Sequence, residues 1–324
     1  MNNKISLIIP SFNAEKNLNR ILSKLNQWTL LPDEIIIIDS SDKKYLLPDF
    51  IKSKIQKIKI KINIIYRKKT YPGHARNIGI KYSKNNILTF LDTSTYPSNK
   101  WLKNIKKILD RKEVKGVWGS TKYEANHAQS RLFRASTYGS KPIATVPGSI
   151  MYKDVFNRVG LFIENVRAGE DVDWSARVKL HEISFTNSNE TLKYEELNNI
   201  NIISLIKKWF RNYMSGSKLP IYNPHKDIYF MAASIISIFI AYNWNNLLAS
   251  WDTNSFYYIP NITKIISLGL ISIYFLIRGV YLPIKKNTKI NFIFPFNFIL
   301  ISLISLLLDI TKLTSFVFTR FNKK

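Results

Sequence analysis

The fold is decided by residues 5–15, ISLIIPSFNAE, in which a short and mostly apolar run is followed at once by a polar turn. The run at 5–9 predicts a buried strand that ends at Pro10, because almost every side chain in it is apolar. A helix with Leu18 and Leu22 on one face is expected to follow the turn.

The same pattern recurs further along the chain. Residues 34–38 and 87–91 are apolar runs that each stop at an aspartate, and residues 57–65 alternate lysine with isoleucine at the period of a strand. Strands that alternate with helices at this spacing predict an α/β fold, a parallel sheet with helices on its faces.

Polar side chains follow each of the predicted strands. Ligands of such sheets bind where the carboxyl ends of the strands meet, so these residues are candidates for a binding site. Each of them also suits a turn or a helix cap, but their convergence on one edge favours a site. The candidates are Ser11, Asn13, Asp39, Asp42, Asp92, Thr93 and Ser94.

Composition excludes several classes of protein. The chain has 324 residues and no cysteine, which excludes disulfides, a cysteine nucleophile and iron–sulfur ligation. No phosphate-binding P-loop and no glycine fingerprint for a dinucleotide follows the first strand. The formal charge is +26, but lysine, isoleucine and asparagine are abundant throughout, so part of it reflects general composition. The acid-free stretch 52–84 lacks interleaved aromatic residues, and we expect no nucleic-acid partner.

The chain changes character after about residue 217. Residues 1–217 mix charge with short apolar runs, whereas 218–324 contain three apolar segments, at about 228–248, 265–284 and 290–308. We interpret these as two or three transmembrane helices, although buried helices of a soluble domain would also be apolar. The run at 5–9 is too short for a cleavable signal peptide.

Basic residues set the expected orientation. Lysines and arginines before the first span and after the second place residues 1–217 in the cytoplasm, on the inner (cytoplasmic) membrane. A third span would put Lys312 and Arg320 outside, against this rule. The last segment is therefore either an exception or re-entrant or interfacial, with 309–321 as an amphipathic helix.

Five motifs now carry a resemblance to a known family. They are residues 5–15, the stretch PDEIIIIDSSD at 32–42, GHARNIG at 73–79, FLDTS at 90–94 with Pro97 and Trp101, and Gly148-Ser149 followed by GEDVDW at 169–174. In this order and spacing the chain, over about residues 4–215, resembles the family 2 glycosyltransferases. The resemblance implies the GT-A fold, a mixed nucleotide-binding sheet flanked by helices, and a nucleotide-sugar donor. It implies a bacterial cell-envelope role in polysaccharide synthesis as well.

The resemblance also implies roles for single residues. Asp171, paired with Glu170, matches the catalytic base, which predicts inversion at the sugar carbon; the same acids would also suit a helix N-terminus. Residues matching the donor site are Pro10, Ser11, Asn13, Glu15, Asp39, Arg76, Asp92 and Ser94. Residues on the acceptor side are Gly148, Ser149 and Trp174.

One motif departs from the family. The usual metal motif is Asp-x-Asp, and this chain has Asp92-Thr93-Ser94, so one carboxylate is missing. The sequence leaves three outcomes open: Mg²⁺ or Mn²⁺ held by Asp92 with water and phosphate, a metal-free mechanism, or a degenerate site. We favour the first, because the Glu170-Asp171 pair is intact.

The sequence thus predicts an inverting glycosyltransferase that moves a sugar to a lipid-linked acceptor at the membrane. Transfer to polyprenyl phosphate is a second hypothesis, and an inactive membrane scaffold of a glycan assembly is a third.

Overall fold

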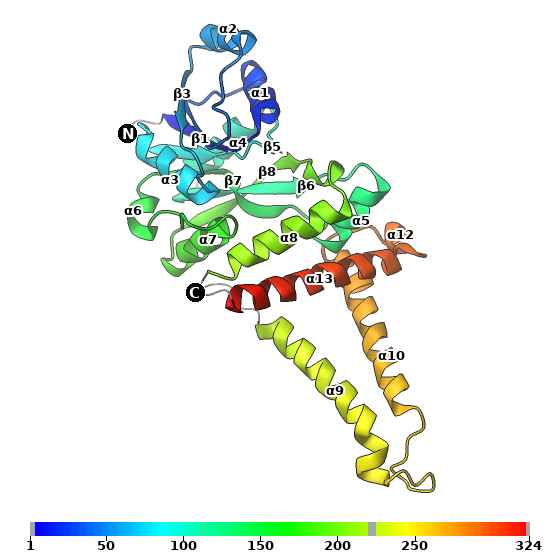
Figure 1. Cartoon of the computed structure of the whole chain (residues 1–324). Coiled ribbons are helices and arrows are strands. Elements are labelled where there is room, and N and C mark those ends of the chain that lie inside the picture. Colours follow the sequence, from blue (N-terminus) through cyan, green and yellow to red (C-terminus); the bar gives the residue numbers. More distant parts are fainter. Residues whose placement is uncertain (1–3, 112, 220–224, 322–324) are drawn as a thin grey trace.

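The computed structural model describes residues 4–111, 113–219 and 225–321, with side chains left out of the description for 225–232. Eight strands form one mixed sheet in the order β3-β2-β1-β4-β7-β6-β8-β5 (Figure 1). The strands are β1 (Ile5–Ser11), β2 (Glu34–Asp39), β3 (Lys61–Tyr66), β4 (Ile87–Phe90), β5 (Thr95–Tyr96), β6 (Gly116–Tyr123), β7 (Ile143–Tyr152) and β8 (Phe185–Tyr194).

The first half of the sheet is parallel, as the alternation of strands and helices predicts. β1 pairs in parallel with β2 and β4, and β2 with β3. The second half is mixed, because β7 runs antiparallel to both β4 and β6 while β8 runs parallel to β6.

Helices cover both faces of the sheet. On one face lie α1 (Glu15–Ser23), α2 (Asp49–Ile58) and α4 (Trp101–Arg111), which pack on alternate side chains of β1 and β2 such as Leu7 and Ile35. On the other lie α3 (Pro72–Tyr82), α6 (Val155–Val159) and α7 (Glu170–Leu180), against Ile8 and Phe90. Because both faces are covered, β1, β2 and β4 are apolar on both sides.

Two boundaries differ from the sequence-based expectation. β1 continues through Pro10 to Ser11, with Pro10 paired in register with Ile38. The strand expected at 57–65 is β3 at Lys61–Tyr66, because residues 57 and 58 still belong to α2, whose buried Ile51 and Ile55 follow the helical period.

Five further helices are the loop helix α5 (Ala128–Ser136) between β6 and β7, the helix α8 (Ile202–Gly216) after β8, and the three long helices of the C-terminal region. These three are α9 (His225–Ala249), α10 (Ile262–Phe275) and α13 (Asn297–Phe321). Short pieces complete the chain: η1 (Leu25–Gln27), η2 (Glu196–Asn198), the π-helical η3 (Leu276–Tyr281), α11 (Leu282–Lys285) and α12 (Ile290–Ile293).

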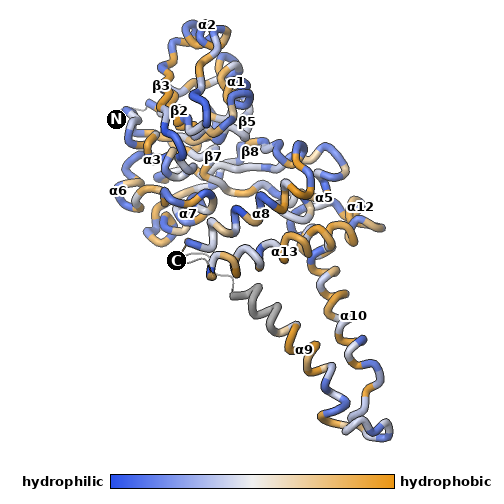
Figure 2. Tube along the Cα trace, in the orientation of Figure 1, coloured by the Kyte–Doolittle hydropathy of each residue, from blue (hydrophilic) through white to orange (hydrophobic). Residues whose placement is uncertain are grey.

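The α9–α10 hairpin points away from the sheet, whereas α13 lies beside α8, at the end of the hairpin that is nearest the sheet (Figure 1). Hydrophobic residues predominate along much of this region (Figure 2). Among the described residues, two helical stretches are long and apolar enough to cross a membrane by length and composition, 262–285 and 297–321. The predicted segment 265–284 lies inside the first, and the predicted segment 228–248 coincides with α9, whose side chains up to residue 232 lie outside the description.

The third predicted segment, 290–308, is wrong as a single helix. The chain forms the short α12, breaks at Phe294-Pro295, and starts α13 at Asn297. Proline has no amide hydrogen and disfavours a helical residue before it, which explains the break. The expected separate tail at 309–321 is likewise absent from the described chain, because α13 runs through to Phe321 with Asp309 paired to Arg278 at 2.8 Å.

Candidate active site

The candidate residues at the strand ends do come together on one edge of the sheet. Ser11 ends β1 and is in register with Asp39 at the end of β2, while Asp92 lies two residues beyond β4. The sheet topology that the sequence predicts therefore builds the edge at which ligands of such sheets bind.

Asp39 is fully buried and organises the loop that follows β2. Its Oδ1 accepts hydrogen bonds from the Ser41 hydroxyl at 2.5 Å and the Ser41 amide at 3.2 Å, and its Oδ2 accepts one from the Tyr45 amide at 2.7 Å. Both carboxylate oxygens thus hold the chain's own backbone. Sequence reasoning expected this residue to contact the donor, and that stays a prediction; in the structure its carboxylate orders residues 40–45.

The loop after β1 is tied to the same segment. Asn13 has a φ of 48° and donates from Nδ2 to Asp42 at 2.8 Å, while its amide donates to Ser41 Oγ at 2.8 Å. Ser11 is buried, and Pro10 is partly so. Glu15 is exposed in the first turn of α1.

Arg76 joins two carboxylates from distant parts of the chain. Its Nη1 donates to Glu170 Oε1 at 2.7 Å and its Nη2 to Asp92 Oδ1 at 2.9 Å. The Arg76 and Glu170 side chains are 3% and 6% exposed, and that of Asp92 is 33% exposed. The sequence places Arg76 at this edge, but its guanidinium neutralises acids there, which makes it a structural element of the site.

Close packing of α3 sets the position of Arg76. A Cβ at Gly79 would lie 2.4 Å from Ile8 Cγ2, and one at Gly73 would lie 2.2 Å from the Ile163 carbonyl oxygen. Glycine at these two positions therefore allows the helix to approach both β1 and the segment before α7.

The acids of the Glu170-Asp171 pair have different surroundings. Burial raises the pKa of Glu170 to about 7, against the lowering effect of Arg76 and with the charge of Asp171 adding to the rise. Asp171 is partly exposed, and its Oδ1 accepts a hydrogen bond from the Val172 amide at 2.8 Å. Among the described residues, no ion pair reaches Asp171. Both residues also open α7, so the helix-terminus interpretation of this acidic cluster holds as well.

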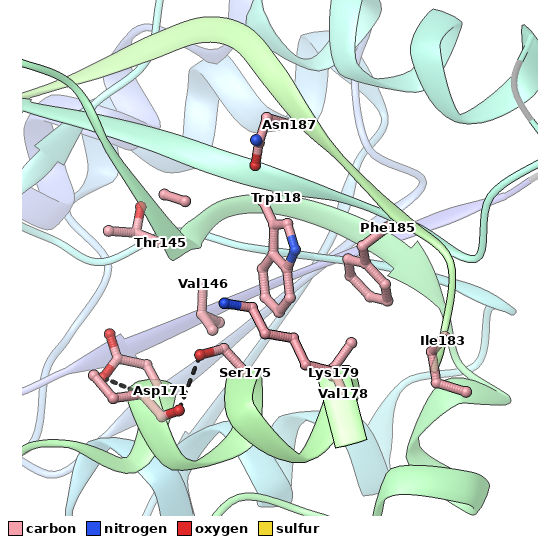
Figure 3. Close-up of a pocket in the computed structure, with 12 residues that line it drawn as sticks. Trp118, Thr145, Val146, Asp171, Ser175, Val178, Lys179, Ile183, Phe185 and Asn187 are labelled. Carbon is pink, nitrogen blue, oxygen red and sulfur yellow. Dashed lines mark hydrogen bonds between the residues drawn. The ribbon is translucent and has the colours of Figure 1, made fainter. Parts of the chain in front are cut away.

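Asp171 lines a pocket of about 490 Å³ beside α7 (Figure 3). Asp171, Ser175 and Lys179 lie on successive turns of α7 along one wall, opposite side chains of β6 and β8 that include Trp118 and Asn187. Sequence reasoning missed this pocket, since its walls come from four elements, β6, β7, α7 and β8, that meet only in the folded chain.

The residues expected on the acceptor side lie inside the protein. Trp174 is 0% exposed, packs against Phe156 with ring centroids 4.9 Å apart, and donates from Nε1 to the Gly160 carbonyl. Ser149 is also fully buried and donates to the Val146 carbonyl, and Gly148 takes a φ of 83°. None of the three lines the pocket beside α7, because each packs within the core that supports α7 and β7.

Sequence reasoning also missed an aromatic and charged cluster beside the sheet edge that carries the candidate site. The Tyr123 and Tyr138 rings stack with centroids 3.6 Å apart, and Lys208 of α8 forms an ion pair with Glu196. The Lys208 Nζ also lies 5.6 Å from the ring centroid of Tyr194, whose pKa burial raises well above its usual value while a hydrogen bond to Ser94 lowers it. Ser94 therefore borders this cluster.

The motif Asp92-Thr93-Ser94 supplies few ligands for a metal ion on its own. No group of three or more histidine or acidic side chains able to hold a metal ion occurs among the described residues. Asp92 has one oxygen committed to Arg76, and its partly exposed carboxylate fits a single ligand position for a hard cation. The remaining ligands would have to come from a diphosphate and water.

Comparison with known proteins agrees with this architecture. Residues 6–159 match the model of the family described as Glycosyl transferase family 2. An uncharacterised glycosyltransferase of Haemophilus influenzae is 26% identical over 210 residues, which cover 59% of this chain and 67% of that protein. The chondroitin synthase of Pasteurella multocida is 30% identical over 129 residues, but the chain spans only 13% of its length.

A solved structure supports the fold alone. The mannosyltransferase PcManGT from Pyrobaculum calidifontis, in complex with GDP-Man and Mn²⁺, superposes with a TM-score of 0.51 over 96% of this chain and 87% of that one, at 12% identity. The mixed sheet with helices on both faces is therefore GT-A-like.

Proposed function

We propose that this chain, a nucleotide-sugar-dependent glycosyltransferase whose residues 6–159 belong to family 2, transfers a sugar with inversion to a lipid-linked acceptor. The transfer would serve the synthesis of a surface polysaccharide or glycolipid. The observation that carries the proposal is the position of Asp171, which faces the pocket while its acidic neighbours are held by Arg76.

Asp171 has the surroundings that a general base needs. A base must reach the acceptor from an open position and must not already be neutralised by a cation. Glu170 and Asp92 both share Arg76, whereas Asp171 lies at the pocket wall (Figure 3). Arg76 therefore fixes the two acids that flank the base, and Asp171 remains available for proton transfer.

The reaction needs one bond to form and one to break. The acceptor hydroxyl oxygen attacks the anomeric carbon, its proton passes to an Asp171 carboxylate oxygen, and the bond from that carbon to the diphosphate oxygen breaks. The bonding electrons leave with the nucleoside diphosphate. Attack opposite the leaving group inverts the configuration of the sugar carbon.

The departing diphosphate gains negative charge, which must be stabilised. A divalent cation, Mg²⁺ or Mn²⁺, would neutralise this charge when bound, and Asp92 is the residue that would hold it. Asp39 and Asn13, by ordering the loops after β2 and β1, would shape the donor site on the same edge.

A lipid-linked acceptor is supported by the contact between α8 and the catalytic loop. The Ser215 hydroxyl of α8 accepts hydrogen bonds from the amides of Arg167 at 2.7 Å and Ala168 at 3.2 Å. The chain then continues through Gly169 into Glu170 and Asp171. Since α8 leads into the apolar α9–α10 hairpin, the proposed base lies close to the anchored side of the domain (Figure 1). We place the catalytic domain in the cytoplasm, at the inner membrane.

One observation favours polyprenyl phosphate as the acceptor itself. Arg211 belongs to α8 and Arg167 to the catalytic loop that Ser215 of α8 holds, and burial together with the charge of Arg167 lowers the pKa of Arg211. A phosphate would be attracted to such a pair. An ionised phosphate oxygen needs little help from a base, so Asp171 would matter less for that acceptor.

The experiment is a thermal-shift screen of detergent-purified protein with UDP, GDP, dTDP, CMP and their sugar conjugates, each with Mn²⁺ or with EDTA. Ligands that bind only the native state raise its melting temperature. Stabilisation by one nucleotide class identifies the donor, and its loss in EDTA or in Asp92→Asn supports a metal at Asp92. The exposed Asp49→Asn is the matched control. Failure of all nucleotides to shift a folded protein would instead favour an inactive scaffold.

A further inference from the structure

The helix α13 has its polar side turned inward. Its buried stripe is mostly small and hydroxylated, whereas the opposite stripe is exposed and apolar. The buried residues are Ile301, Ser302, Ser305, Leu308, Thr311, Ser315 and Thr319. The exposed residues include Leu300, Leu303, Leu307, Ile310 and Val317, which are between 44% and 50% exposed.

This arrangement is the reverse of a helix on the surface of a soluble domain. There the apolar stripe faces the core and the polar stripe faces water. Exposed leucines and isoleucines repeating every three to four residues along 25 residues form a contiguous apolar surface, which is unfavourable in water and favourable in lipid.

The buried stripe packs on the catalytic domain along the whole length of α13. Near its start, the Ile301 carbonyl accepts a hydrogen bond from Ser136 of α5 at 3.3 Å. In the middle, Leu308 packs with Phe133 and Leu205 of α5 and α8. Beside this stripe, near the end of the helix, the half-exposed Phe318 ring also lies 6.1 Å from Phe210 of α8. Because of these contacts, α13 lies against the catalytic domain (Figure 1).

Such packing conflicts with a transmembrane position. At about 1.5 Å per residue, a 25-residue helix is roughly 37 Å long and would traverse the whole hydrocarbon core. Because α5 and α8 lie beside it, exposed charges such as Arg131 and Lys207 would enter that core. Each charge there costs about 2.5–3.5 kcal/mol.

We infer that α13 lies in the plane of the membrane surface, with its exposed apolar stripe in the lipid and its polar stripe on the catalytic domain. This inference rests on the membrane anchoring in the proposed function. The lipid leaflet nearest the catalytic domain covers the exposed apolar stripe of α13. Of the described helices, only those of the α9–α10 hairpin cross the bilayer.

The basic residues around α13 fit this placement. Lys286, just beyond α11, donates from Nζ to the Thr137 carbonyl, and its own carbonyl accepts from the Ser140 amide at 2.8 Å, so this end of the hairpin is joined to the domain. Lys312 extends toward α8, with Nζ 5.4 Å from the Tyr213 ring centroid. An in-plane α13 keeps Lys312 and Arg320 on the same side as these groups, which removes the exception to the positive-inside rule.

The absence of cysteine from the whole chain makes single-cysteine labelling straightforward. Leu300→Cys, Leu307→Cys and Val317→Cys sample the start, middle and end of one stripe at nearly equal exposure, 47%, 46% and 50%. Each variant is labelled with a fluorophore, reconstituted into phosphatidylglycerol-containing vesicles, and quenched by lipids that carry a nitroxide at different depths.

An in-plane helix places all three labels at one shallow depth, about 5–10 Å into the headgroup and acyl boundary. A deep Leu307→Cys label between two shallow ones would show that α13 crosses the membrane. Labels that no lipid quenches would show that water or a protein partner covers the stripe. Either result overturns the inference.

A second measurement separates this inference from the anchoring itself. An impermeant maleimide is added to sealed vesicles that carry Ser53→Cys in the catalytic domain, Phe256→Cys in the hairpin loop, or Arg320→Cys at the end of α13. We expect the cysteine of Arg320→Cys to react on the same side of the vesicle membrane as that of Ser53→Cys. The cysteine of Phe256→Cys should lie on the opposite side. Labelling of Arg320→Cys with Phe256→Cys overturns the inference and leaves the anchoring intact, whereas Phe256→Cys on the side of Ser53→Cys shows that the hairpin does not cross.

Discussion

Replacing Arg76 by methionine tests the centre of the candidate site. The change keeps much of the side-chain volume but removes the cation that Glu170 and Asp92 share at 2.7 and 2.9 Å. Glu170 then remains buried without a partner, a loss that typically costs about 3–5 kcal/mol. Asp92 is one-third exposed and adds little to this cost.

The cost depends on pH, because Glu170 can become neutral. Burial already raises its pKa to about 7, and loss of Arg76 removes a lowering influence. A carboxyl whose pKa is raised on folding stabilises the protein fully below its unfolded value, and this stabilisation is lost as pH rises through the folded value. We therefore expect Arg76→Met to be only mildly destabilised at pH 5.5 and strongly destabilised at pH 8.5.

The assay is thermal unfolding in detergent across this pH range. At about 2–4 °C per kcal/mol for a domain of this size, the melting temperature at pH 8.5 should fall by roughly 6–20 °C. Adding Glu170→Gln to Arg76→Met removes the unpaired charge and should recover part of the loss and flatten the pH dependence. Arg20→Met is the matched control, since its ion pair with Glu195 is exposed and worth about 1 kcal/mol or less.

Two outcomes would refute this reasoning. One is an Arg76→Met protein whose melting temperature at pH 8.5 equals that of the wild type. The other is a double variant that recovers nothing, which would mean that Arg76 stabilises the fold through packing and not through Glu170.

Four other substitutions test neighbouring parts of the site. Asp171→Asn should abolish transfer to a hydroxyl acceptor while nucleotide-induced stabilisation persists, and full activity in a radiolabelled-sugar assay would exclude this residue as the base. Asp39→Ala should release the loop after β2 and weaken nucleotide affinity at least tenfold by calorimetry, since three hydrogen bonds are lost. Gly169→Ala should lower both stability and turnover, because φ is 94° and the new Cβ would lie 2.6 Å from Leu219; unchanged unfolding and kinetics would contradict this. Ser215→Ala should cost about 1–2 kcal/mol from two unpaired amides and reduce turnover more than donor affinity, as steady-state kinetics would show.

The sequence is most informative where hydrophobic periodicity is strong. The runs at 5–9 and 34–38 lie in strands and the run at 87–91 does so up to residue 90, because a strand buried on both faces has few alternatives. The prediction from residues 57–65 was wrong at its start, since Lys57 and Ile58 complete a helix in which Ile51 and Ile55 are buried at the helical period. The extent of α13 was missed as well, because its length depends on Pro295 and on the partner of Asp309.

Residue types in the site were easier to predict than their contacts. Motif spacing brought Arg76, Asp92 and Glu170 to one edge, but nothing in the spacing says that one guanidinium bonds both acids. Trp174 is near the Glu170-Asp171 pair in sequence and yet points into the core, because successive residues of a helix point in different directions. The pocket and the Tyr123–Tyr138 stack are invisible to sequence reasoning for the same reason, since both are built from elements that meet only in three dimensions.

The position of α13 has a consequence for biosynthesis. Phe133 and Leu205 of the catalytic domain are covered by Leu308, which follows every strand of the sheet and both helices of the hairpin in the chain. During translation this apolar patch stays open until the ribosome has passed α13, and open apolar surface invites association with other chains. If the hairpin is the membrane anchor that we propose, the order of synthesis would let it reach the bilayer before α13 closes this patch of the domain.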